Sequence, residues 1–114
     1  MPKVKLNDLQ KKQVSFLTNR FRKIVREKGI KAQIIGRRLY SIVAHLIAEK
    51  GINYDDLYLI IDSLSAGEEF EMYMLSNDKY FKTRLETAKR LEARGLISTQ
   101  KKDYKKLSLI HISE

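Results

Sequence analysis

A basic segment near the carboxyl end carries the residues whose types and spacing best suit chemistry. Residues 79–94 are typical of an α-helix with apolar positions three or four apart on one face. Projected at about 100° per residue, the opposite face collects the polar side chains of Lys79, Lys82, Thr83, Glu86 and Arg90, with Lys89 at its edge. In a DNA major groove, lysine can donate to guanine, threonine can contact a thymine methyl and glutamate can accept from cytosine. We therefore expect this face to recognise bases, chiefly through Lys79, Lys82, Thr83 and Glu86.

A lysine-rich turn follows this helix. Gly95 is expected to end the helix, and 96–100 and 106–112 are expected to form two short strands. Around the turn between them lie Lys101, Lys102, Lys105 and Lys106. These side chains are suited to phosphates or to the minor groove. Alternatively, they only protect an edge strand from pairing with another chain.

No motif supports an enzyme. The chain lacks the phosphate-binding pattern GxxxxGK[ST], the dinucleotide-binding pattern GxGxxG, the nucleophile pattern GxSxG and the zinc pattern HExxH. Seven carboxylates are close in sequence: Asp55, Asp56, Asp62, Glu68, Glu69, Glu71 and Asp78. Most are explained by helix starts and surface turns, so we expect no catalytic residue among them.

Metal and cofactor sites are not expected either. The chain has no cysteine, and its two histidines are His45 and His111. We expect His45 to have no second histidine, cysteine or carboxylate at metal-ligand spacing and to be a partly solvated structural residue. We therefore expect no metal and no cofactor.

The distribution of charge indicates a polyanionic partner. The 114-residue chain has a net charge of +9 and an isoelectric point near 9.8. Basic side chains dominate residues 1–50 and 79–114, whereas residues 51–78 carry seven acids and no Lys or Arg. This pattern favours nucleic acid, although the acidic segment could face a protein partner. No stretch approaches the roughly 20 apolar residues of a membrane span, so we expect a cytoplasmic protein without a membrane partner.

Two helices are expected before residue 51. Asn7 and Gln10 form a capping-box pattern for a helix over 8–28 that ends at Gly29. Its basic face is either only solvated or lies along a phosphate backbone. A second helix over 33–49 has a broad apolar stripe, which indicates burial against more than one neighbour. That stripe contains Ile35, Leu39, Ile42, Val43 and Leu46, widened by Ile34 and Ile47.

The acidic segment 51–78 contains further signals for where helices begin and end. Asn53 is an expected N-cap for a helix over 54–65, with Ile52 and Leu57 at the positions of a hydrophobic staple. Residues 68–70 are expected to form a short strand and 71–76 a short helix. Asn77 and Asp78 are typical of a turn that caps the following helix.

Two runs within 51–113 carry a family resemblance. Residues 51–60, GINYDDLYLI, are similar to the opening of the first core helix in SarA-type regulators of the MarR superfamily. Residues 91–97, LEARGLI, look like the end of their recognition helix. The resemblance implies a dimeric winged-helix regulator whose recognition helix enters the major groove, while a wing arginine in an Asp-x-Arg pattern enters the minor groove.

This chain departs from the family pattern in the wing and at the ends. Asp103-Tyr104-Lys105 matches the wing pattern, with lysine in place of arginine. Lysine lacks the planar guanidinium with which arginine donates two parallel hydrogen bonds. We therefore expect the wing to hold the DNA by charge rather than to recognise its sequence. Family members usually carry dimer-building helices after the wing, and one helix before the core. We therefore expect the two helices before residue 51 to build the dimer.

Together these patterns predict one α+β, mainly α, winged helix-turn-helix domain over 1–114. Residues 1–50 form its N-terminal helical dimerisation segment, and 51–114 its core with a β-hairpin wing. We expect a homodimeric, sequence-specific transcriptional regulator of double-stranded DNA and not an enzyme. One alternative is an accessory DNA-binding protein of plasmid or phage replication, partition or transfer. The other is a winged-helix protein-interaction module or inhibitor that uses the acidic segment 51–78.

Overall fold

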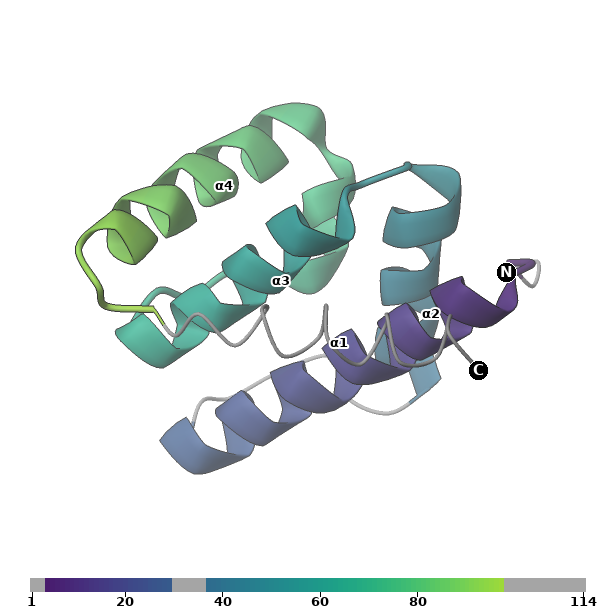
Figure 1. The fold of residues 1–114 in the computed structure, drawn as a ribbon, viewed down its shortest axis with the longest axis horizontal. Coiled ribbons are helices and arrows are strands. Elements are labelled where there is room, and N and C mark those ends of the chain that lie inside the picture. Colours follow the sequence, from purple (N-terminus) through teal and green to yellow (C-terminus); the bar gives the residue numbers. More distant parts are fainter. Residues whose placement is uncertain (1–3, 30–36, 98–114) are drawn as a thin grey trace, which may run out of the picture.

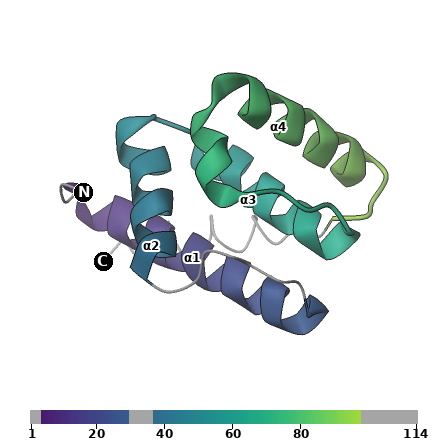
Figure 2. The same ribbon diagram turned by 180° about the vertical axis from the view of Figure 1, so that it is seen from behind.

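A computed structural model describes residues 4–29 and 37–97 of the chain. Its elements are α1 (Asp8–Lys28), α2 (Arg37–Ala44), the π-helical η1 (His45–Glu49), α3 (Tyr54–Asp62), and the 3₁₀ turns η2 (Ser63–Ala66) and η3 (Met72–Ser76), then α4 (Asp78–Ala93). α3 lies between α4 and α1, and α2 crosses at one end (Figures 1 and 2). The described residues thus form an all-helical domain of four α-helices without a β-strand.

The first helix has the predicted bounds and the predicted cap. The Asn7 side chain accepts a hydrogen bond from the Gln10 N–H at 2.8 Å, and the Gln10 side chain accepts one from the Asn7 N–H at 3.0 Å. Gly29 ends the helix with φ of 66°. The predicted inner residues Val14, Leu17, Phe21, Ile24 and Val25 are all buried. The local pattern therefore sufficed to define α1.

The second helix ends in a wider turn than an α-helix has. Lys50 N–H donates to the His45 carbonyl at 3.0 Å, five residues back, and Ile52 N–H donates to the Leu46 carbonyl at 3.0 Å. The first of these is an i→i−5 bond, which defines a π-turn, and the second spans six residues. Gly51, with φ of 68°, then redirects the chain toward α3. The predicted start at residue 33 lies outside the described residues.

The apolar stripe of α2 and η1 is buried within a single chain. Leu39, Val43 and Leu46 have no exposed surface, Ile47 is buried, and Ile42 is half-buried. The neighbours of this segment are α1 and η3. Burial against more than one neighbour is thus confirmed, and both neighbours belong to the same molecule.

The third helix is the core of the domain. Asn53 caps it by accepting a hydrogen bond from the Asp56 N–H at 3.2 Å, as predicted. Most of its circumference is buried, which is typical of a helix covered on several sides. Its buried residues are Tyr54, Leu57, Tyr58, Leu59, Ile60, Ile61 and Asp62. The predicted helix over 54–65 ends in the 3₁₀ turn η2, and Gly67 follows with φ of 97°.

The predicted strand over 68–70 is wrong. A strand needs a ladder partner, but other groups take up the backbone of this segment. Glu68 N–H donates to the Ser63 carbonyl at 3.1 Å. The Arg84 side chain donates to the Glu69 carbonyl at 3.3 Å. The short helix predicted over 71–76 is confirmed as η3, with Met72 and Leu75 buried as expected.

The end of α4 has the glycine stop that the sequence indicates. Gly95, with φ of 75°, donates its N–H to the Glu92 carbonyl at 2.9 Å, and Leu96 N–H donates to the Leu91 carbonyl at 3.0 Å. These two bonds form a Schellman motif. Leu96 and Ile97 are not in a strand, and the rest of the predicted strand over 96–100 lies outside the described residues. So does the return strand over 106–112. Among the helices of residues 4–29 and 37–97, none is long and apolar enough to cross a membrane.

Candidate nucleic-acid interface

Helix α4 lies at the surface with one face against the rest of the domain. Asn77 caps it, as predicted, by accepting a hydrogen bond from the Tyr80 N–H at 2.9 Å. On the inner face Ala88 is buried, while Phe81, Leu85 and Leu91 are half-buried against the core. The inner contacts of α4 are with α3 and with η2 and η3 (Figure 1). This packing leaves the other face of the helix open to solvent.

The open face carries all six residues that the sequence predicts for it. Every one of these side chains is exposed, namely Lys79, Lys82, Thr83, Glu86, Lys89 and Arg90. Within the described part of the chain, Lys79, Lys82 and Lys89 form no ion pair. Their positive charges are therefore available to an external anion.

Hydrogen bonds within α4 restrict what two of these side chains can offer. The Thr83 hydroxyl donates to the Lys79 carbonyl at 3.1 Å. Its proton is thus occupied, and what remains for a partner is its methyl group and its acceptor lone pairs. Arg90 donates to the Thr87 hydroxyl at 3.4 Å through one nitrogen, which leaves its other donors open.

The predicted wing residues cannot be placed beside this face. Lys101, Lys102, Lys105 and Lys106 lie outside the described residues, as does the Asp103-Tyr104-Lys105 run. The interface described by the structure therefore consists of α4 and its supports.

Two side chains that the sequence analysis did not single out fix α4 to the preceding segment. The Tyr80 hydroxyl accepts a hydrogen bond from the Glu71 N–H at 3.0 Å. Arg84 donates to the Glu69 carbonyl, and its Nη1 lies 3.6 Å from Glu68 Oε1. The guanidinium of Arg84 also lies 5.9 Å from the centre of the Tyr80 ring, within cation–π range. Their spacing of four residues on one helix is the signal that could have identified this pair.

An ion pair lies at the start of α4. Lys50 Nζ is 3.4 Å from Asp78 Oδ1, and the Asp78 side chain is 96% exposed. An exposed pair of this kind contributes little to stability. Its effect on the interface is electrostatic, because it places a cation beside the carboxylate that precedes Lys79.

One basic residue of α1 is used internally. Arg20 Nε lies 2.8 Å from Asp62 Oδ1, and the Asp62 side chain has no exposed surface. Burial raises the pKa of the Asp62 carboxyl, and the hydrogen bond and charge of Arg20 offset this only in part. Burial also acts to lower the pKa of Arg20, but the hydrogen bond and charge of Asp62 outweigh it and raise that pKa. We assign the larger desolvation cost to Asp62, the more buried partner.

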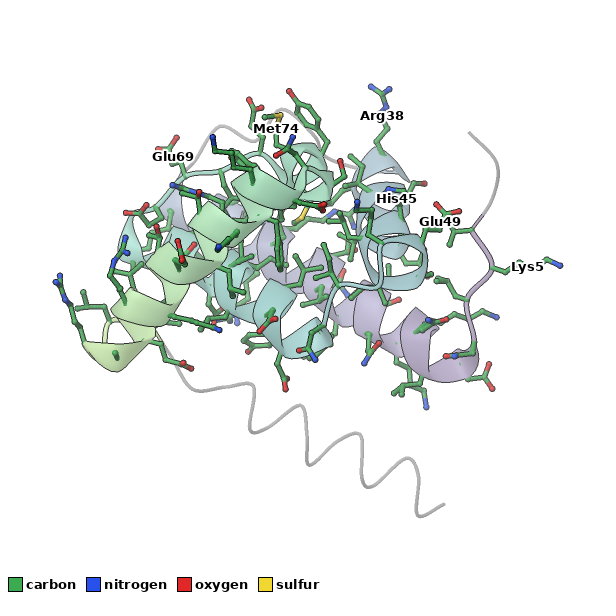
Figure 3. All side chains as sticks on the ribbon, turned by 90° about the horizontal axis from the view of Figure 1, so that it is seen from above. Lys5, Arg38, His45, Glu49, Glu69 and Met74 are labelled. Atoms are coloured by element: carbon green, nitrogen blue, oxygen red, sulfur yellow. The ribbon has the colours of Figure 1, made fainter. Side chains whose placement is uncertain are left out.

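The expectation that no carboxylate lies at ligand spacing from His45 is wrong, because Glu49 lies four residues further along the chain. His45 Nδ1 and Glu49 Oε1 lie 2.5 Å apart, one turn apart on η1 (Figure 3). His45 is partly exposed, as expected. Across residues 4–29 and 37–97, no three His, Cys, Asp or Glu side chains are grouped closely enough to hold a metal ion.

No protein-family model, curated protein or solved structure matches this chain. The resemblance to MarR-superfamily regulators therefore rests on the two sequence runs alone.

Proposed function

We propose that this protein is a sequence-specific, double-stranded DNA-binding transcriptional regulator that inserts α4 into the major groove. The observation that carries the proposal is the open face of α4, where three lysines without ion pairs in the described residues surround Thr83 and Glu86. A major groove accepts one α-helix and offers both phosphates and base edges to such a face.

In this proposal η3, Asn77 and α4 act as the helix-turn-helix of a winged-helix domain. A single residue separates η3 from α4, and Leu75 of η3 is buried in the core, which supports a fixed angle between the two elements. Tyr80 and Arg84 hold α4 to residues 68–71 from the other side. The lysine-rich segment 101–106 is proposed to lie on the DNA backbone or in the minor groove.

The roles of the side chains follow from their position along α4. Lys79, Lys82 and Glu86, together with the Thr83 methyl, lie in the half of the helix that reaches base edges in such complexes. Lys89 and Arg90 lie further along and are proposed to contact phosphates. Asp78 would oppose the phosphates, and its pairing with Lys50 reduces that repulsion.

A titration of labelled duplexes with the full chain tests the proposal. At about 50 mM salt we expect binding that weakens steeply as salt is added, because phosphate contacts release counterions. Lys5 is an exposed lysine outside α4, so Lys5→Ala is the control for Lys82→Ala. Absence of binding at low salt, or an equal loss in both variants, would contradict the proposal.

A homodimer through residues 1–50 is proposed with an interface that is mainly polar. The described residues of the apolar stripe that motivated it pack within one chain, and Ile34 and Ile35 of that stripe lie outside the described residues. In the described part of this segment, Leu9 is the one large apolar residue that is well exposed, with 45% of its surface accessible to solvent. Sedimentation at tens of micromolar tests the dimer, and a monomer at about that concentration would contradict it.

A protein partner is the second candidate, and one observation favours it. Glu69, Glu71 and Tyr73 are exposed, and Figure 3 shows Glu69 and Met74 on the same side of the molecule. A hydrogen bond from Tyr73 to Glu71 raises the pKa of Tyr73. A basic protein would suit this surface, and its retention after nuclease treatment of the native complex would favour this function.

A role in replication, partition or transfer would use the same α4 face, and genome-wide mapping of bound sites would distinguish it from promoter regulation.

A further inference from the structure

Helix α1 carries a second basic face. Its inner residues pack into the core, and the side chains on the far side are exposed. The exposed residues of that side and its edges are Asp8, Leu9, Lys11, Lys12, Ser15, Asn19, Lys23, Arg26 and Glu27. Four of the nine are basic, and the two acidic residues lie near the two ends of the helix.

The charges of this face are not neutralised by the part of the domain that the structure describes. None of Lys11, Lys12, Lys23 and Arg26 forms an ion pair with any residue of 4–29 or 37–97. Arg20, which lies on the flank of the helix, is by contrast bound to Asp62. The acidic residues of α1 are Asp8 in its first turn and Glu27 near its end. The four bases outnumber these two acids, so this side of α1 has a net positive charge.

The position of α1 sets the direction in which this charge points. α1 packs on α2 and α3, and α3 lies between α1 and α4 (Figures 1 and 2). Because the inner face of α1 is turned toward α3, its basic face points away from α4. One duplex held by α4 therefore does not cover this face.

The chemistry of the face fits a phosphate backbone. From Lys11 to Arg26 the helix rises about 22 Å at 1.5 Å per residue, which spans several phosphates of a duplex. Ser15 and Asn19 can donate to phosphate oxygens, and their small size lets the backbone approach. Membrane-surface helices need an exposed apolar face, whereas the apolar stripe of α1 is buried.

We propose that the basic face of α1 binds the phosphate backbone of a second DNA duplex, so that one chain joins two duplex segments. This inference rests on the proposed function, since α4 must hold the first duplex. The second contact is independent of sequence, because no base-reading geometry is required of a helix that lies along the backbone.

A capture assay with the full chain tests this inference. One duplex is fixed to beads, protein is bound, and a second labelled duplex is added at about 50 mM salt. The test variant is Lys12→Glu with Lys23→Glu. The control is Lys5→Glu with Arg38→Glu, which changes net charge equally at exposed side chains that extend from the body of the domain (Figure 3). Circular dichroism checks the helix content, sedimentation checks the mass, and fluorescence anisotropy measures single-duplex affinity.

Wild type should capture the second duplex, and the test variant should capture it at least about tenfold less. The control should stay within about twofold of wild type, and all three proteins should bind a single duplex. If wild type binds no duplex at all, the proposed function fails. If wild type binds one duplex but captures no second, or if the test variant captures as wild type does, this inference alone fails.

Three other outcomes would also overturn the inference. Equal losses in test and control variants would mean that capture of the second duplex depends on the net charge of the protein and not on the basic face of α1. A loss accompanied by a change in sedimenting mass would assign it to a dimer interface on α1. Binding of wild type to phosphatidylserine vesicles without second-duplex capture would assign the face to a membrane surface.

Discussion

Arg20 on α1 and Asp62 at the end of α3 form an ion pair whose Nε and Oδ1 atoms lie 2.8 Å apart. The Asp62 side chain has no exposed surface, and the Arg20 side chain is 14% exposed. Asp62 Oδ2 has no hydrogen-bond partner among the described residues. The pair therefore joins the helix that carries the second basic face to the helix that supports α4, at a desolvation cost borne mainly by Asp62.

Removal of one partner should destabilise the domain strongly. Arg20→Met leaves a buried carboxylate without its cation, and we expect a loss on the order of 3 kcal/mol in the free energy of unfolding. The double variant Arg20→Met with Asp62→Leu should lose less, because neither charge remains buried. Urea denaturation followed by circular dichroism measures both. Arg26→Ala, at an exposed site of the same helix, should stay within about 0.5 kcal/mol of wild type. A double variant less stable than the single one would contradict this account.

The same carboxyl should give stability a measurable pH dependence. Burial raises the pKa of Asp62, so the folded state binds its proton more tightly than the unfolded chain does. The stabilising contribution is therefore present below about pH 4, the ordinary aspartate range, and is lost as pH rises through the raised value. Compared with wild type, Asp62→Asn should become relatively more stable as pH is raised from about 4 to 7. The opposite trend in paired denaturation curves would mean that Arg20 outweighs burial.

Lys82 and Lys89 should respond differently to truncation. Lys82→Ala is expected to lose about 1–3 kcal/mol of binding free energy and to relax preference at one base position. Lys89→Ala should weaken all duplexes about equally and reduce the salt slope by about 1. Affinities for a selected site and its single-base variants, measured at several salt concentrations, separate the two effects. If both variants behaved alike, the division of α4 into base-reading and phosphate-binding halves would be wrong.

Arg84 should act on DNA binding through the position of α4. Arg84→Gln removes the cation–π contact and weakens the bonds to residues 68–69, at a cost of about 1 kcal/mol. Hydrogen exchange in residues 68–76 should quicken, and duplex affinity should fall although Arg84 is not on the open face. Arg94→Gln removes one charge at an exposed position just after α4 and serves as the control. Unchanged exchange with reduced affinity would instead indicate a direct DNA contact by Arg84.

Local signals in the sequence were sufficient for the helices and for the open face of α4. Asn7, Asn53 and Asn77 cap their helices as predicted, because each cap bonds a backbone N–H only three residues away. Gly95 ends α4 in a left-handed conformation that glycine adopts without strain. The six polar residues of α4 are exposed because helical periodicity alone separates them from the apolar face. The wing and the α+β assignment depend on residues outside the described part.

Other features were decided by contacts between residues far apart in the sequence. The strand expected over 68–70 does not form, and Arg84 on α4 donates to the Glu69 carbonyl that a ladder would have used. The described part of the apolar stripe on α2 is also not available to a partner chain, because α1 and η3 of the same chain cover it. Composition and periodicity show that a helix has an apolar face, but not which element will cover it.

The sequence by itself determined where helices begin and end and which side of α4 and α1 is basic, since these depend on bonds and spacing within a few residues. Only the tertiary structure decided that Arg20 is bound to Asp62, 42 residues away, and that the basic faces of α1 and α4 point in different directions. Both depend on how α3 packs between its neighbours. That packing is a property of the assembled core rather than of any local run of residues.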